Sequence, residues 1–140
     1  MVTREDMESF LIRMDLDYEE VDDGMWLVRN RNGGPPFVVH YSPPLLLLRM
    51  KVMDLPTSEG SAELYRTLLE LNATDVVHGA YGIEEDELIL SDTLELETLD
   101  FLELQASVES MQLAASGHLE QIRTLSGADA GPVSRAEVEG

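Results

Sequence analysis

Cysteine is absent from this 140-residue sequence, and so are long apolar runs. Without cysteine the chain has no disulfides, no thiolate metal ligands and no cysteine nucleophile. The longest apolar run, Leu45–Leu48, is far shorter than the roughly 20 residues of a membrane-spanning helix. The first ten residues, MVTREDMESF, also lack the apolar segment of a signal peptide. We therefore expect a cytoplasmic protein.

Positive charge is scarce. The sequence has 9 Lys and Arg residues against 28 Asp and Glu residues, which gives a formal net charge of -19. This field repels phosphate and anionic lipid, because no basic stripe is present to release counterions. Direct binding to nucleic acid or to a membrane is not expected, whereas a basic protein partner would be attracted. The alternative is that the charge only keeps the protein soluble.

Motifs for catalysis or metal binding are missing as well. No Ser-His-Asp order and no GxSxG elbow occurs. The segment GGPP at residues 33–36 is not a phosphate-binding loop, because proline removes the amide donors that such loops use. His40, His78 and His118 have no HxH or HExxH spacing, which favours structural roles over a zinc site. We expect no enzymatic activity, no metal and no cofactor.

The first half of the chain predicts one helix followed by strands. Thr3 and Asp6 form a capping box, and the apolar spacing behind them predicts a helix over Arg4–Met14. Turn signals separate three predicted strands: Met25–Arg29, Phe37–Tyr41 and Leu45–Met53. Tyr18–Val21 is left open as a short strand or an extended lead-in. In the third strand, alternation places four residues on one face: Leu46, Leu48, Met50 and Val52.

The second half predicts two helices around a hairpin. An apolar arc over residues 62–72 is wide for a helix that covers a single sheet. Strands over Val76–Ile83 and Leu88–Leu96 precede a long helix from Glu97 to about Leu125. Together these elements predict one α+β domain over residues 1–125, with the order α-β-β-β-α-β-β-α. Its antiparallel five-stranded sheet would pack with three helices. Residues 126–140, an acidic Gly- and Ala-containing segment, predict a disordered tail.

Four consecutive acids, Glu84–Glu87, lie between the last two predicted strands. The simplest interpretation is a hairpin turn, where carboxylates stay hydrated. The segment lacks the DxDxDG spacing of a calcium loop. A small-ligand or divalent-cation-responsive regulator that uses this turn remains the alternative function.

Three short motifs of the second half occur in a recognisable order: LLELN at residues 68–72, GAYGI at 79–83 and ELIL at 87–90. This order resembles a signature of YbjN-like proteins and CesT-type type III secretion chaperones. The signature is a helix ending in LLxxN, a glycine-containing strand, an acidic turn and a strand of the xLxL type. The resemblance implies a bacterial α+β subunit that usually forms a homodimer. It also implies binding of an unfolded client segment without ATP, or, for YbjN-like members, regulatory roles associated with stress responses.

These observations lead us to interpret the chain as a non-enzymatic protein-binding module, chaperone-like or regulatory. It would hold a client protein, including a basic one that itself binds nucleic acid, through apolar patches and strand edges. The expected dimer interface comprises Leu64, Tyr65, Leu68, Leu71, Tyr81 and Ile83. The expected client-binding residues are Met25, Trp26, Val28, Phe37 and Val39.

Overall fold

The computed structural model describes residues 1–30, 34–55 and 62–126. Within these ranges the chain forms three helices and six strands. In chain order they are α1 (Arg4–Arg13), β1 (Asp17–Asp22), β2 (Met25–Arg29), β3 (Phe37–Ser42), β4 (Leu45–Asp54), α2 (Ala62–Thr74), β5 (Ala80–Glu84), β6 (Glu87–Glu95) and α3 (Phe101–Ser126). The predicted α+β class is confirmed, with one more strand than the sequence predicts.

The six strands form one antiparallel sheet in the order β1-β2-β3-β4-β6-β5. The sheet has six strands where five were predicted, because Tyr18–Val21, left open in the sequence, is part of β1, which pairs with β2 from Asp17 opposite Arg29 to Asp22 opposite Met25. Only Tyr18 of β1 is partly buried. The strand therefore lacks the alternation of apolar residues by which a half-buried strand is recognised.

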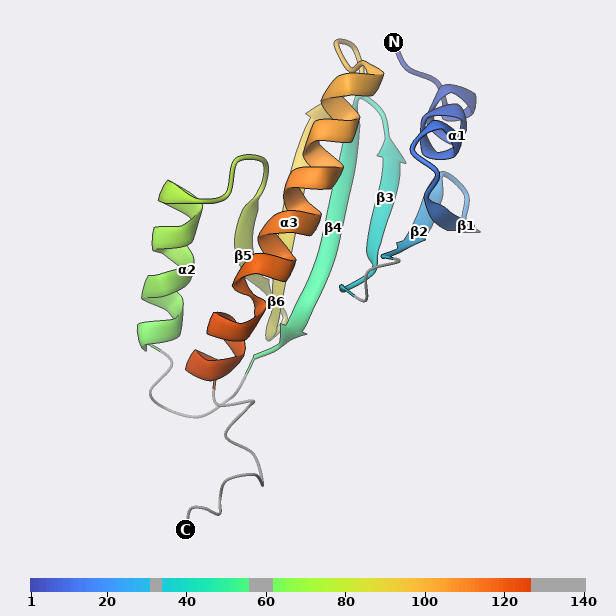
Figure 1. Ribbon diagram of the computed structural model, residues 1–140. Coiled ribbons are helices and arrows are strands. Elements are labelled where there is room, and N and C mark those ends of the chain that lie inside the picture. The colour runs from blue at the N-terminus through green and yellow to red at the C-terminus, as the bar shows by residue number, and fades with distance from the viewer. Residues whose placement is uncertain (31–33, 56–61, 127–140) are drawn as a thin grey trace.

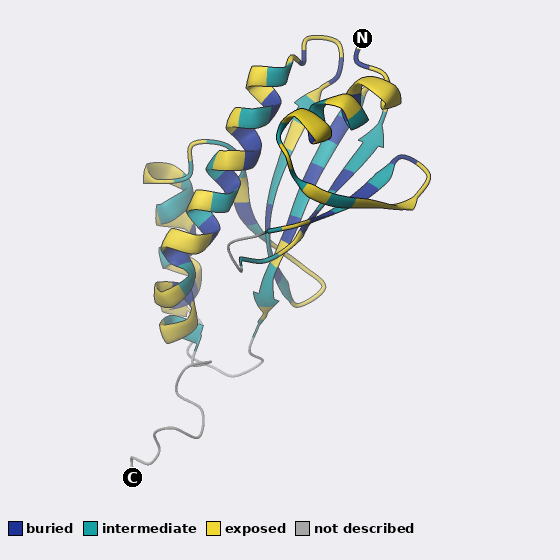
Figure 2. Cartoon of the chain, turned by 45° about the vertical axis from the view of Figure 1, so that its right-hand side comes forward, coloured by how far each residue is buried: buried dark blue, intermediate teal, exposed yellow. Residues whose placement is uncertain are grey.

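All three helices lie on one face of the sheet (Figure 1). They and the facing strand residues form a single hydrophobic cluster, in which Met7 of α1, Leu64 of α2 and Leu104 of α3 are fully buried. Figure 2 shows buried and partly exposed residues alternating along the central strands. The predicted face of β4 is confirmed: Leu46, Leu48 and Met50 are buried, and Val52 packs against them. Each fully buried side chain of this size contributes about 1.5–3 kcal/mol.

Side chains define where two of the helices begin. The predicted capping box of α1 is present, with Thr3 and Asp6 each bonding the other's backbone amide. The long helix begins at Phe101 and not at Glu97. The carboxylate of Asp100 accepts a hydrogen bond from the Glu103 amide at 2.8 Å and so caps the first turn.

The connection from α2 to β5 is longer than the sequence predicts. The amides of Asp75 and Val76 both donate to the Leu71 carbonyl, at 2.9 and 3.0 Å, which continues the end of α2. Gly79 then turns the chain with a φ of 91°, a conformation that favours glycine. Residues 76–79 are therefore not part of the strand, which begins at Ala80.

The carboxyl-terminal prediction falls mostly outside the described residues. Ser126 ends α3, and residues 127–140 of the predicted tail are not described. None of the described helices has the length and apolar character needed to cross a bilayer.

Candidate binding surfaces

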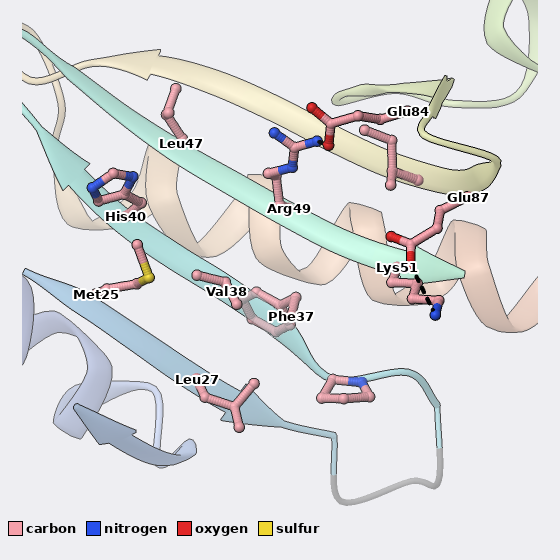
Figure 3. Close-up of a pocket in the computed structure, with 12 residues that line it drawn as sticks. Met25, Leu27, Phe37, Val38, His40, Leu47, Arg49, Lys51, Glu84 and Glu87 are labelled. Atoms are coloured by element: carbon pink, nitrogen blue, oxygen red, sulfur yellow. Dashed lines mark hydrogen bonds and ion pairs between the residues drawn. The ribbon is translucent and has the colours of Figure 1, made fainter. Parts of the chain in front are cut away.

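The face of the sheet opposite the helices carries a strip of apolar side chains (Figure 3). Successive residues of a strand point to opposite sides, so the residues between the core positions face this side. The apolar members are Met25, Leu27, Val38, Leu47 and Ile89, and all five are partly exposed. The uncovered face of an antiparallel sheet normally presents polar residues to water. This strip is therefore apolar surface available to a partner.

A cavity of about 490 Å³ lies on this open face, with apolar side chains of β2 and β3 on one side and the ion pairs of β4 and the β5–β6 hairpin on the other. Arg49 pairs with Glu84 across β6 (Figure 3). The Lys51 ammonium lies 3.0 Å from carboxylate oxygens of both Asp54 and Glu87. Hydrogen bonds to Asp54 and then to Glu87 raise the pKa of Lys51, so this side chain remains charged.

The acidic segment forms the predicted hairpin turn between β5 and β6. Glu85 and Asp86 occupy its tip, both with positive φ (49° and 64°), and the Asp86 carbonyl accepts a hydrogen bond from the Leu55 amide at 2.8 Å. The flanking Glu84 and Glu87 are engaged by the two cations of the open face. Among the described residues, no group of three or more His, Asp or Glu side chains is placed to hold a metal ion.

Four of the five side chains expected to bind a client lie in the core instead: Trp26, Val28, Phe37 and Val39. Phe37, at 3% exposed, also lines the open-face cavity, whereas Trp26, Val28 and Val39 do not. Met25 does line the open face. The prediction missed the sequence neighbours Leu27 and Val38, which stand opposite each other on β2 and β3, and Leu47 on β4. Their signal was the apolar character of both faces of these strands.

A second apolar surface lies between α2 and the edge strand β5. It forms a groove of about 380 Å³, and none of its described lining residues is charged. Its exposed members are Tyr65, Leu69 and Ile83, which are 37%, 68% and 53% exposed. An uncharged exposed patch of this kind, in a chain with a net charge of -19, is a candidate contact surface.

Four of the six residues expected at a dimer interface line this groove: Tyr65, Leu68, Tyr81 and Ile83. Buried or half-buried against the chain's own core are Leu64, Leu68, Leu71 and Tyr81. Tyr65 and Ile83 are exposed in the groove, where the structure brings them together with Leu69. Leu69 is absent from the predicted set although it is the most exposed of the three.

Tyr81 connects the groove to the interior through a chain of hydrogen bonds. Its hydroxyl lies 2.8 Å from His118 Nδ1, and His118 Nε2 lies 2.9 Å from Asp75 Oδ2. In a neutral imidazole, Nε2–H donates to Asp75 and Nδ1 accepts from the Tyr81 hydroxyl. Burial, and then the charge of Asp75, raises the pKa of Tyr81 far above its usual range. The arrangement is unsuited to nucleophilic catalysis, because Tyr81 is buried and holds its proton.

Comparisons with known proteins identify the same architecture. The CesT_Tir_1 family model matches residues 2–128. A chain of the heterodimeric ExoU–SpcU complex from the type III secretion system of Pseudomonas aeruginosa has a TM-score of 0.66 at 14% identity, covering 81% of this chain and 95% of that chain. YbjN from E. coli has a TM-score of 0.64 at 11% identity, with 85% and 92% covered.

A chain of the ExsC–ExsE complex has a TM-score of 0.63 at 14% identity, and the match covers 87% of this chain and 97% of that chain. At sequence identities this low, the structural similarity shows that the fold is shared and nothing more. A search of curated proteins by sequence found no match.

Proposed function

The chain belongs to the CesT_Tir_1 family of type III secretion chaperones, and from this membership we propose that it is a non-enzymatic, chaperone-like or regulatory module that binds a client protein. The observation that carries the proposal is the apolar strip on the open face of the sheet. Its side chains project from a rigid sheet, so a client segment meets a preformed surface.

The size of the strip sets the kind of binding that it supports. Each of its side chains is partly exposed, so covering it yields only a fraction of the roughly 1.5–3 kcal/mol of full burial. Association costs about 4 kcal/mol or more in lost freedom. The strip therefore needs a client segment long enough to cover most of it, and additional backbone contacts strengthen the complex.

Strand addition at a sheet edge would supply those backbone contacts. At the β5 edge, the backbone amide and carbonyl of Tyr81 are already bonded to the side chain of Asn72. β1 forms the opposite edge of the described sheet, and four of its six residues are acidic. We place strand addition at β1, where the acidic side chains favour a basic client segment.

The groove between α2 and β5 is the proposed homodimer interface. Two copies that each carry a net charge of -19 repel each other, so their contact is most favourable where charge is absent. Tyr65, Leu69 and Ile83 supply apolar area there, and a twofold axis would bring the same patch of both copies together.

The charge of the chain also bears on the client and on the alternative function. A basic client, including one that binds nucleic acid, would be steered to this cytoplasmic protein at low ionic strength. Among the described residues no group of three or more His, Asp or Glu side chains is placed to hold a metal ion, so nothing there favours a cation-responsive regulator.

Binding of an unfolded reporter tests the proposal. Reduced, alkylated lysozyme is a basic chain that cannot refold, and fluorescence anisotropy reports its binding. We expect binding by the wild type and loss of binding in the double variant Leu27→Glu with Val38→Glu. The matched control is Leu102→Glu with Leu113→Glu, which changes two exposed leucines on α3. Equal binding by all three proteins would reject the open face as the client surface.

A further inference from the structure

The cavity on the open face changes in character across the sheet: its charged lining residues come from β4 and the β5–β6 hairpin, and the residues contributed by β2 and β3 are mostly apolar. Met25, His40 and Leu47 line the end nearest the β3–β4 turn, and His40 lies between Met25 and Leu47 in register across the three strands. Arg49 and Lys51 lie further along β4, toward the β5–β6 hairpin (Figure 3). A segment that crosses the sheet from β2 toward the β5–β6 hairpin would thus meet apolar side chains first and charged side chains at its other end.

The charged end carries an excess of negative charge. Its cations are Arg49 and Lys51. The carboxylates of the ion pairs and of the hairpin tip are Asp54, Glu84, Glu85, Asp86 and Glu87. Each cation already has a carboxylate partner, whereas Glu85 and Asp86 are exposed at the tip. The local field is therefore negative even where the positive side chains are located.

We propose that the open face recognises a bipartite polypeptide segment of another protein, with apolar residues at one end and Lys or Arg at the other. This proposal rests on the proposed client-binding function and specifies the client's sequence and its placement. The apolar residues cover Leu27, Val38 and Leu47, and the basic side chains lie against Glu84 and Glu87 at the hairpin.

The ion pairs already present at the hairpin oppose the binding of a client cation only weakly. Solvent-exposed ion pairs contribute about 0–1 kcal/mol each. Glu84 and Glu87 are 52% and 40% exposed, so a client cation can join them without displacing buried groups. An acidic segment would meet cations that are already neutralised, together with the repulsion of the hairpin carboxylates.

Selection from a random 12-residue phage-displayed library tests the proposal, because it requires no known client. Peptides are selected against the wild type and counter-selected against the Leu27→Glu, Val38→Glu variant, which keeps only ligands of the open face. Synthetic copies of these peptides are then titrated against Glu84→Gln, Glu87→Gln. The matched control is Glu109→Gln, Glu120→Gln, which removes the same charge from exposed positions on α3.

We expect the retained peptides to carry apolar residues followed or preceded by Lys or Arg. They should bind the Glu84→Gln, Glu87→Gln variant roughly five-fold more weakly, as for loss of one surface ion pair, and the α3 control unchanged. Retained peptides without basic residues, or equal weakening in both variants, would overturn the bipartite proposal and leave the client-binding function intact. Failure to retain any peptide would instead count against the proposed function. If the Leu27→Glu substitution dissociates a dimer, a second copy of this chain covers the open face. That result would overturn both the bipartite proposal and the proposed client-binding function.

Discussion

The side chain of Asn72 pairs with both backbone polar groups of Tyr81. The Tyr81 amide donates to Asn72 Oδ1 at 2.7 Å, and Asn72 Nδ2 donates to the Tyr81 carbonyl at 3.1 Å. A residue of α2 thus occupies hydrogen-bonding groups that an edge strand otherwise leaves open. This pairing fixes β5 against α2, and it restricts backbone addition at this edge of the sheet.

Replacement of Asn72 by Ala should destabilise the fold by about 1–3 kcal/mol, because two partly buried hydrogen bonds are lost and their backbone partners are left unpaired. Urea denaturation measures the change, and hydrogen exchange of the Tyr81 amide should accelerate. Thr74→Ala is the control, since Thr74 donates only to an exposed carbonyl one turn back. Equal stability of the two variants would contradict the role given to Asn72.

The free energy of unfolding should fall at alkaline pH because of the buried Tyr81 hydroxyl. Its folded pKa is raised above the ordinary value of 10.0, so the phenol is neutral in both states below pH 10. Above pH 10 the unfolded chain releases a proton that the folded chain retains, which favours unfolding as the pH rises. Thermal melts of the wild type and Tyr81→Phe across pH 9–11 measure this effect. The variant should lose less stability over that range. Equal losses of stability in the two proteins would contradict the burial of the Tyr81 hydroxyl.

The hairpin tip offers a stabilising substitution. Glu85 and Asp86 both have positive φ, the conformation in which Asn-Gly is the preferred two-residue turn. We expect Glu85→Asn with Asp86→Gly to raise the free energy of unfolding by about 1 kcal/mol. Glu85→Gln, Asp86→Asn removes the same charge without supplying glycine. An equal gain from that control would assign the effect to charge and not to the backbone.

The α2–β5 groove should control self-association. Tyr65→Glu with Leu69→Glu places charge on exposed positions, so the monomer should stay folded while the dimer dissociates. Sedimentation velocity measures the change, with Leu102→Glu, Leu113→Glu as the control on exposed leucines of α3. A monomeric wild type, or a dimer that survives the groove variant, would contradict this interface.

Periodicity in the sequence predicted most of the fold but did not determine which sheet face is covered. In β2 both sets of alternate residues are apolar, Met25 and Leu27 on one face and Trp26 and Val28 on the other, so the strand alone does not distinguish them. In β3, His40 and Ser42 share the face of Val38, a polar signal of the uncovered face that the prediction did not use. The position of the three helices decides between the two faces, and that position depends on tertiary packing. β4 was assigned correctly because Arg49 and Lys51 mark its uncovered face.

The other errors of the sequence-based prediction concern the edge strand β1 and the apolar arc of α2. β1 is an acidic edge strand with one partly buried residue, so its pairing with β2 left no apolar pattern in the sequence. The wide apolar arc of α2 was real, but its inner part, Leu64 and Leu68, packs on the chain's own core. The exposed remainder, Tyr65 and Leu69, could be separated from it only once the helix was placed against β5.

Site-specific photo-crosslinking tests the central claim most directly. Benzoylphenylalanine replaces Val38 on the open face or, as the control, Leu113 on α3, and each protein is irradiated with unfolded, alkylated lysozyme. Lysozyme should crosslink through position 38 and not through position 113, because the client covers the apolar strip. Crosslinking through position 113 alone, or no crosslinking of a bound client through position 38, would contradict the claim that the open sheet face binds polypeptides.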